Sequence, residues 1–325
     1  MKKQLAENLY EYTLKNEHLE VKFLNIGGAI TKIALAEDNF SENLVLAYDD
    51  PLQYLDNSMF LNTLIGRTSN RIKDGKFDLL GRTIQLDLND GPNNLHGGVD
   101  NLTHKNFEVL EHPGGYLLKA RLDHQESGFP GNLDIQVAYV LEGSGLVVSY
   151  EAVTDQPTIA NLTHHAYFNL SGNLKTDVAD HQVEIGADFI AEIDGTSAFT
   201  ENLLPVGVTR FDFNDMRPIV APHYEGGYDH LYVLNGKNPA AIVWDPASGR
   251  KLTVTTTEPA MQFYSGNYID ESTTFENGRI GEIYLGACLE THKIPYDYAS
   301  QQLNPGETYR QETRFEFTKG DPVTE

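Results

Sequence analysis

The sequence predicts an all-β fold: one large antiparallel β-sandwich domain over residues 1–325. Three observations predict it. Apolar and polar side chains alternate with a period of two in many short segments, as expected for strands with one buried face. Segments with helical spacing are scarce. Turn residues (28 Gly and 14 Pro) recur along the whole chain, and no Pro-, Gly- or Ser-rich linker divides it. A sandwich of this size offers a broad cleft on one sheet, where alternate side chains can meet a ligand.

The clearest strand pattern predicts a β-hairpin. Large apolar residues take the odd positions in residues 133–139, and the alternation resumes over residues 146–150 after a turn that contains Gly143 and Gly145. Such a glycine-bearing turn between two alternating segments is typical of hairpins. The same alternation predicts further strands over residues 183–190, 251–257 and 313–317.

Residues 50–55 are the best candidate for a helix. Asp50 suits the N-cap, because its carboxylate can accept a hydrogen bond from a free backbone N–H. Pro51 suits the first helical position, where its missing N–H is not needed. We expect a helix of only a turn or two.

Composition excludes several classes of protein. Lys and Arg number 24 against 47 Asp and Glu, so the net charge is −23 and argues against binding to nucleic acid or to an anionic membrane. No apolar run approaches the roughly 18 residues that span a bilayer. The two lysines near the start precede no apolar segment, so we expect no secretory signal and a cytoplasmic protein. Cys288 is the only cysteine, which excludes an intrachain disulfide and a multi-cysteine metal site.

Two polar segments in the first third of the chain could bind a ligand. Residues 66–72 contain Arg67 and Arg71, a spacing more typical of solvated surface than of a site. Residues 91–98 form a glycine-rich loop around His96. Small neighbours would let a ligand approach the imidazole closely, although His96 could equally fill the loop.

The segment 161–170 contains adjacent histidines, His164 and His165. Neighbouring residues on a strand point to opposite faces, so both cannot bind one metal ion on a regular strand. His165 would share a face with Tyr167, whereas His164 would share a face with Ala166. We therefore expect one histidine to carry protons and the other to be structural.

Two later segments end in acidic side chains. Asp229 closes a turn and could bind hydroxyl groups or simply cap the turn. Glu290 ends an apolar run, where an unpaired charge would be costly. A raised pKa with a role as general base is one explanation, and a hidden salt bridge is the other. No zinc-protease, nucleophile-elbow, dinucleotide-binding or P-loop motif is present.

Taken together and in order, six segments resemble those of the aldose 1-epimerase family. They are G-R-x-x-N-R-I at 66–72, N-x-L-H-G-G at 93–98, a variant of N-L-T-N-H-S-Y-F-N-L at 161–170, Y-D-H at 228–230, a variant of Q-x-Y-T-G-N at 262–267 and L-E-T at 289–291.

The resemblance implies a β-sandwich, often called a supersandwich, and an isomerase that interconverts the α and β anomers of free sugars such as galactose and glucose without a metal or other cofactor. It places the catalytic roles on His165 and Glu290. It assigns sugar binding to Asn70, Arg71, His96, Tyr167, Asp229 and Gln262.

The chain also departs from the family pattern. His164 stands where the family often has Asn, Ala166 stands where it has Ser or Thr, and residues 99–107 and 292–298 differ as well. These changes leave the acid–base pair intact and leave the preferred sugar open.

Anomerisation needs an ionised carboxylate and a protonated imidazole, which fits Glu290 and His165. Three alternatives remain: a disaccharide with a free reducing end such as maltose, a 6-phosphorylated hexose, and a sugar-binding protein without catalysis. The few basic residues near the candidate site argue against the phosphorylated sugar, and the presence of both Glu290 and His165 argues against the silent binder.

Overall fold

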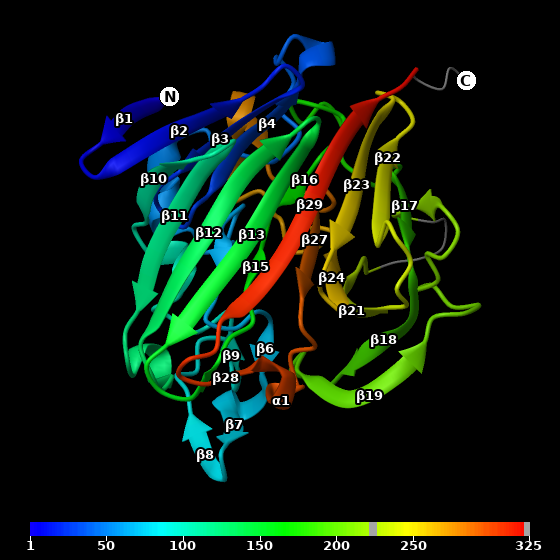
Figure 1. Cartoon of the computed structure of the whole chain (residues 1–325). Helices are drawn as coiled ribbons and strands as arrows, with labels where there is room; N and C mark the ends of the chain where they lie inside the picture. Colours follow the sequence, from blue (N-terminus) through cyan, green and yellow to red (C-terminus); the bar gives the residue numbers. More distant parts are fainter. Residues whose placement is uncertain (221–225, 322–325) are drawn as a thin grey trace.

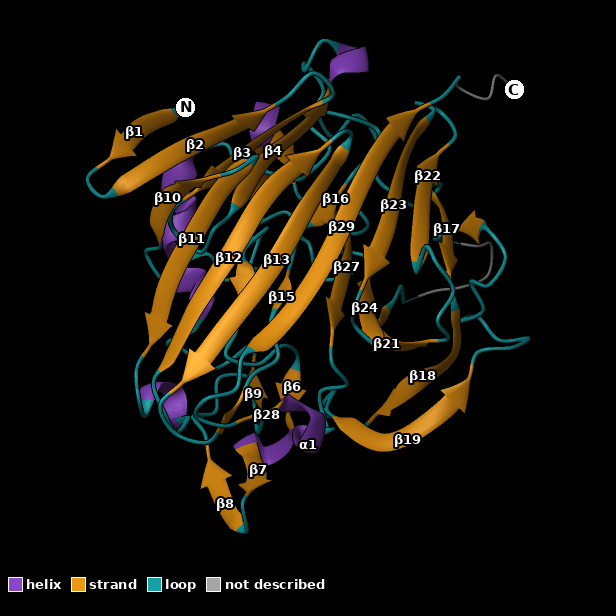
Figure 2. Cartoon of the chain, in the orientation of Figure 1, coloured by secondary structure: helices purple, strands orange, loops and turns teal. Residues whose placement is uncertain are grey.

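The computed structural model describes residues 1–220 and 226–321, and its main strands form three antiparallel sheets (Figures 1 and 2). The largest sheet has nine strands in the order β10 (Glu108–His112), β11 (Gly115–Leu122), β12 (Leu133–Glu142), β13 (Gly145–Thr154), β29 (Tyr309–Lys319), β23 (Arg250–Thr256), β22 (Ala241–Asp245), β17 (Gln182–Ile185) and β20 (Arg217–Pro218).

A second sheet has six strands in the order β16 (Tyr167–Phe168), β27 (Ala287–His292), β24 (Ala260–Tyr264), β21 (Asp229–Leu234), β18 (Ala187–Ile193) and β19 (Phe199–Pro205). A third, at the N-terminal end, has β1 (Lys2–Ala6), β2 (Leu9–Lys15), β3 (Leu19–Leu24) and β4 (Ile30–Leu35).

Short strands and short helices complete the regular secondary structure of the described residues. The strand pairs are β5 (Leu64–Ile65) with β15 (Thr163–His164), β6 (Arg71–Ile72) with β9 (Asn94–Leu95), β7 (Lys76–Leu79) with β8 (Arg82–Gln85), β14 (Thr158–Ile159) with β28 (Gln302–Leu303), and β25 (Thr274–Phe275) with β26 (Arg279–Ile280). The helices are α1 (Tyr298–Gln301) and the 3₁₀ turns Ala36–Asp38, Pro51–Asp56, Lys73–Gly75, Leu102–His104, Glu126–Gly128 and Glu276–Gly278. Within residues 1–220 and 226–321, no helix is long and apolar enough to cross a membrane.

Aromatic side chains fill the space between the sheets. Phe168 on β16 packs against Phe315 and Phe317 on β29, with ring centroids 5.4 and 6.1 Å apart, and so joins the six-stranded sheet to the nine-stranded one. Phe23 on β3 lies edge-on to Tyr139 on β12 at 5.2 Å and joins the N-terminal sheet to the same core. Aromatic pairs of this kind contribute more than their buried area alone.

The predicted hairpin, the strands near residues 251–257 and 313–317, and the short helix are confirmed. Strands β12 and β13 pair from Leu133↔Thr154 to Glu142↔Gly145. The helix Pro51–Asp56 begins after Asp50, whose carboxylate accepts a hydrogen bond from the N–H of Leu52.

The prediction of one strand over residues 183–190 was wrong. Strand β17 ends at Ile185 in the nine-stranded sheet, and β18 begins at Ala187 in the six-stranded sheet. A Cβ on Gly186, between them, would lie 2.6 Å from Cβ of Lys237, so the crossing point requires glycine. The alternation continues in the sequence through Phe189, but this side chain is exposed and Ile190 is buried instead, because β18 has an irregular register between Ala187 and Phe189.

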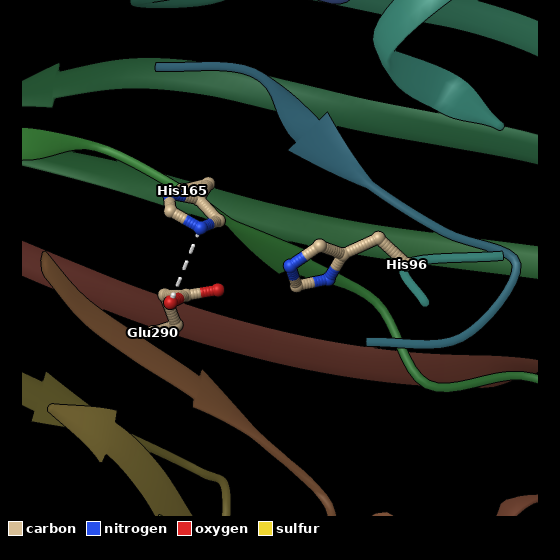
Figure 3. Close-up of side chains that lie close together, drawn as sticks. All are labelled: His96, His165 and Glu290. Atoms are coloured by element: carbon tan, nitrogen blue, oxygen red, sulfur yellow. Dashed lines mark ion pairs between the residues drawn. The ribbon is translucent and has the colours of Figure 1, made fainter. Parts of the chain in front are cut away.

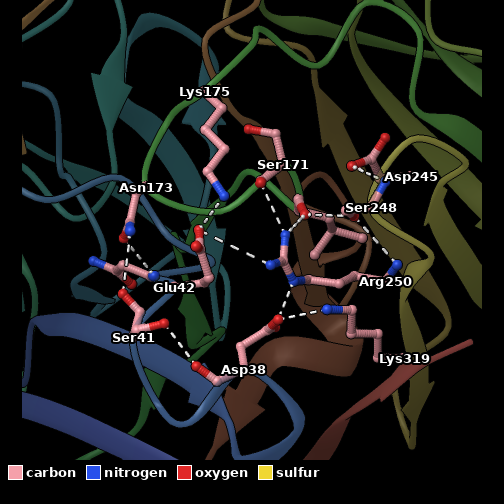
Figure 4. A network of polar contacts seen from close by, with 12 residues as sticks. Asp38, Ser41, Glu42, Ser171, Asn173, Lys175, Asp245, Ser248, Arg250 and Lys319 are labelled. Atoms are coloured by element: carbon pink, nitrogen blue, oxygen red, sulfur yellow. Dashed lines mark hydrogen bonds and ion pairs between the residues drawn. The ribbon is translucent and has the colours of Figure 1, made fainter. Parts of the chain in front are cut away.

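A buried polar cluster ties the Ala36–Asp38 turn to two strands of the large sheet (Figure 4). The Nε of Arg250 on β23 lies 2.8 Å from Oδ2 of Asp38, and its Nη1 donates to the carbonyls of Leu170 and Ser171. Lys319 on β29 also contacts Asp38. Because both cations have partners, the cluster holds the strands together without leaving an unpaired buried charge.

Candidate active site

A cavity of about 280 Å³ opens on the six-stranded sheet, beside β24 and β27. Its walls come from segments far apart in the sequence, and Figure 3 shows three of them bringing His96, His165 and Glu290 toward one another. All eight residues that the sequence indicated as site residues line this one cavity: Asn70, Arg71, His96, His165, Tyr167, Asp229, Gln262 and Glu290.

Glu290 and His165 face each other at the floor of the cavity. Glu290 lies on β27 opposite Gln262 on β24, and Glu290 is only 2% exposed. His165 follows β15 and is 6% exposed. The His165 Nε2 lies 3.5 Å from the Glu290 Oε1. This distance is longer than a good hydrogen bond, but a hydroxyl group that contacts both atoms can carry a proton from one to the other.

Burial shifts the pKa values of this pair in opposite directions. It raises the pKa of Glu290 well above its ordinary value; the charge of Asp229 adds to this rise, and Arg71 opposes it. Burial lowers the pKa of His165 to about 4. A charged pair was expected from the sequence, but burial of both groups favours the neutral pair, with the shared proton on Glu290. Both forms contain one proton, so they interconvert without exchange with solvent.

His96 is held in one tautomer by the backbone. The N–H of Asn70 donates to Nδ1 of His96 at 3.1 Å, so Nδ1 carries no proton and the neutral ring carries it on Nε2. His96 therefore offers the cavity a hydrogen-bond donor. The nitrogen and oxygen atoms of His96, His165 and Glu290 that can bind a metal lie within 4.8 Å of one another. A metal ion at Nε2 of His96 would need the lone pair of that nitrogen, but in this tautomer Nε2 carries a proton. The set fits a hydroxyl group better than a metal.

A chain of amide and carboxylate groups forms one wall. Asn70 Nδ2 donates to Oε1 of Gln262 at 2.9 Å, and Nε2 of Gln262 donates to Oδ1 of Asp229 at 2.6 Å. Burial raises the pKa of Asp229, while Arg71 and the bond from Gln262 oppose the rise. Arg71 in turn pairs through Nε with Oδ2 of Asp90 at 2.6 Å. Donors and acceptors thus alternate along the wall, which suits a ligand rich in hydroxyl groups.

The structure adds six lining residues that were not predicted from the sequence. Among them, Phe60 lies edge-on to the His96 ring at 4.7 Å, while the predicted Tyr167 stacks on the His165 ring at 5.0 Å. Leu95 and Tyr264 belong to the segments 93–98 and 262–267, so the family resemblance could have found them, whereas the other four residues lie in no quoted segment. The additional lining residues are Ser58, Met59, Phe60, Leu95, Tyr264 and Tyr268.

His164 faces away from the cavity, as the strand alternation predicted. It is 3% exposed, and its ring lies edge-on to Tyr139 in the core at 6.0 Å. Neither ring nitrogen has a hydrogen-bond partner among residues 1–220 and 226–321. Burial lowers its pKa to about 3, so the ring is neutral near pH 7.

The model of the aldose 1-epimerase family matches residues 10–316. The chain belongs to the aldose 1-epimerase family. It is 34% identical to a galactose mutarotase from Homo sapiens over 95% of this chain and 94% of that protein. It is 31% identical to an aldose 1-epimerase from Escherichia coli strain K12, with 94% of each chain covered.

Solved structures agree with this family membership. A galactose 1-epimerase from Lactobacillus acidophilus superposes with a TM-score of 0.87 at 28% identity, covering 99% of this chain and 98% of that one. An aldose epimerase homologue from C. elegans superposes with a TM-score of 0.89 at 26% identity, covering 96% and 100%. The predicted fold class, an antiparallel β-sandwich of the galactose mutarotase type, is confirmed.

Proposed function

We propose that this protein is an aldose 1-epimerase that interconverts the α and β anomers of free aldoses such as galactose and glucose. The facing pair of His165 and Glu290, buried in a cavity with alternating donors and acceptors, carries the proposal. Names of relatives at 31–34% identity over nearly the whole chain support it.

In this mechanism the two side chains move one proton each. Glu290 removes the proton from the anomeric hydroxyl while His165 gives a proton to the ring oxygen, and the bond between C1 and the ring oxygen breaks. Rotation about C1–C2 turns the aldehyde over. Ring closure then reverses both transfers, so no proton is gained or lost overall. Each positioned transfer contributes about 10² to 10⁴-fold to the rate.

The charged form of the pair is the productive one. A sugar hydroxyl that donates to the Glu290 carboxylate stabilises its charge, and Arg71 lowers its pKa further. The proton can then pass from Glu290 to Nε2 of His165 through a bridging hydroxyl, because the two atoms lie 3.5 Å apart. Burial therefore favours the neutral pair, and a bound sugar shifts the pair to the charged form that reacts.

The remaining lining residues would hold the sugar in place. His96 donates through Nε2, the Asn70–Gln262–Asp229 chain offers amide and carboxylate groups, Arg71 adds a cation, and Tyr167 supports the His165 ring. Fixing several hydroxyls at once orients the ring oxygen toward the acid and reduces the entropy lost in the reaction step.

A disaccharide with a free reducing end is the second candidate substrate, and one observation favours it. Tyr268 lies at the cavity and is 70% exposed, with its ring stacked on Tyr264 at 5.8 Å. C1 and C4 lie at opposite ends of a pyranose, so a sugar with C1 at the buried floor directs C4 outward. An aromatic ring at the mouth could then contact a second sugar.

Polarimetry on freshly dissolved α-D-galactose, α-D-glucose and α-maltose tests both candidates. We expect the wild type to accelerate mutarotation and Glu290→Gln to lose the acceleration. Glu258→Gln is the matched control, because Glu258 is also buried with a raised pKa but lies outside this cavity. Normal turnover by a folded Glu290→Gln protein would refute the mechanism, and the three sugars would rank the substrates.

The predicted cytoplasmic location remains part of the proposal. A single cysteine and a free-sugar substrate are compatible with a reducing compartment. Fractionation of cells that produce the natural protein would test it.

A further inference from the structure

We infer that Cys288 is a positioning residue for His165, holding the imidazole so that Nε2 faces Glu290 and the sugar. This inference rests on the proposed function, because it assigns a role to a neighbour of the proposed acid.

The geometry places the thiol on the rear nitrogen of the ring. The Sγ of Cys288 lies 3.5 Å from Nδ1 of His165, while Nε2 of the same ring lies 3.5 Å from Glu290. Cys288 and Glu290 are two residues apart on β27, so both side chains leave the same face of the strand. One strand thus contacts both nitrogens of the imidazole.

Neighbouring strands fix this arrangement. Cys288 pairs with Tyr167 across β16 and with Tyr264 across β24, and the Tyr167 ring stacks on His165. Cys288 is fully buried, and burial raises its pKa well above the ordinary value, with the charges of Glu290 and Asp229 adding to the rise. The sulfur therefore keeps its proton and stays neutral, and its lone pairs can accept a weak hydrogen bond.

A thiol suits this place because its sulfur can accept a proton donor in both states of the ring. When His165 is neutral, Nδ1–H can donate to the sulfur, which leaves the lone pair of Nε2 free to take the proton from Glu290. When His165 is charged, Nδ1–H keeps the same contact with the sulfur, and the second proton on Nε2 faces Glu290 and the sugar. A carboxylate at this position would favour the charged imidazole strongly, whereas a neutral thiol follows both states at little cost.

Two substitutions separate positioning from packing. Cys288→Ser keeps a group that donates and accepts, and Cys288→Val fills the space without either ability. We expect Cys288→Ser to keep kcat within about 3-fold of the wild type. We expect Cys288→Val to lower kcat by about 3- to 10-fold, the range one neutral hydrogen bond supplies, with KM for the sugar within about 2-fold. A packing role predicts the opposite order, because a buried hydroxyl fits an apolar space less well than Val does.

The tautomer of His165, read from the nitrogen NMR signals of its ring in the sugar-free protein, provides a test independent of turnover. We expect Nδ1–H in the wild type and in Cys288→Ser, and a mixture of both tautomers in Cys288→Val. The same tautomer in all three proteins, or equal kcat for the Ser and Val variants, would overturn the inference. If the wild type does not catalyse mutarotation, the proposed function fails, and the tautomer result still decides whether Cys288 orients His165.

Discussion

His164 should make the fold sensitive to acid, and replacing it with Asn should remove part of that sensitivity. Its folded-state pKa is about 3 against an ordinary value of 6.5, because burial penalises the charged ring. The unfolded chain therefore takes up a proton below pH 6.5, whereas the folded protein does not until about pH 3. The stability that the neutral ring retains is complete above pH 6.5 and is lost as the pH falls through this window.

The magnitude follows from the two pKa values. Each pH unit within the window costs about 1.4 kcal/mol, so between pH 7 and pH 4.5 His164 alone should lower the free energy of unfolding by about 2.5 kcal/mol. Asn has no charge to gain over this range. His164→Asn should therefore lose about 2.5 kcal/mol less than the wild type over the same interval.

Urea unfolding of both proteins at pH 7 and pH 4.5 measures this difference. The cavity that the smaller Asn leaves affects both pH values alike, so the pH 7 measurement is the internal control. Mutarotation should continue in the variant, because His164 points into the core and not into the cavity. An unchanged loss of stability between the two pH values would refute the assignment of His164 as a buried neutral group.

Three further predictions concern the site. His165→Asn should lower kcat by about 10² to 10⁴-fold, as should Glu290→Gln, with circular dichroism unchanged; polarimetry measures both, and near-normal rates would contradict the assigned roles. The rate should stay level around neutral pH, falling on the acid side near the lowered pKa of His165 (about 4) and on the alkaline side at the raised pKa of Glu290, as the pair gains a second proton or loses its only one. Gln262→Leu leaves Asp229 without its amide donor and should lower kcat/KM by about 10-fold or more, whereas an unchanged kcat/KM would show that this wall does not bind the sugar.

The alternation of apolar and polar residues predicted strands of the nine-stranded sheet but not the point at which the chain crosses to the six-stranded sheet. The alternation in residues 133–150 was sufficient for the hairpin, because each strand there buries one face along its whole length. The same rule failed at Gly186, because apolar residues continue at odd positions through Phe189 although the chain changes sheet there and Phe189 is exposed. The need for glycine there arises from Lys237, which is distant in sequence.

The candidate site was predictable only in part from single segments. The alternation around His164 and His165 correctly separated a core histidine from one that faces the cavity. The meeting of His96, His165 and Glu290 came from the family resemblance, because no spacing rule joins residues so far apart in the chain. Met59 and Phe60 carried no polar signal, and their place in the lining arises from the tertiary fold alone.

The position of β29 has a consequence for synthesis on the ribosome. This strand, residues 309–319, lies in the middle of the nine-stranded sheet between β13 and β23 (Figure 1). Until those residues emerge, β13 and β23 lack a common partner, and each presents an open edge of unpaired backbone groups. The edge of β13 therefore stays open while residues 155–308 are made, and the edge of β23 joins it after residue 256, a period in which chaperones would protect the nascent chain from aggregation.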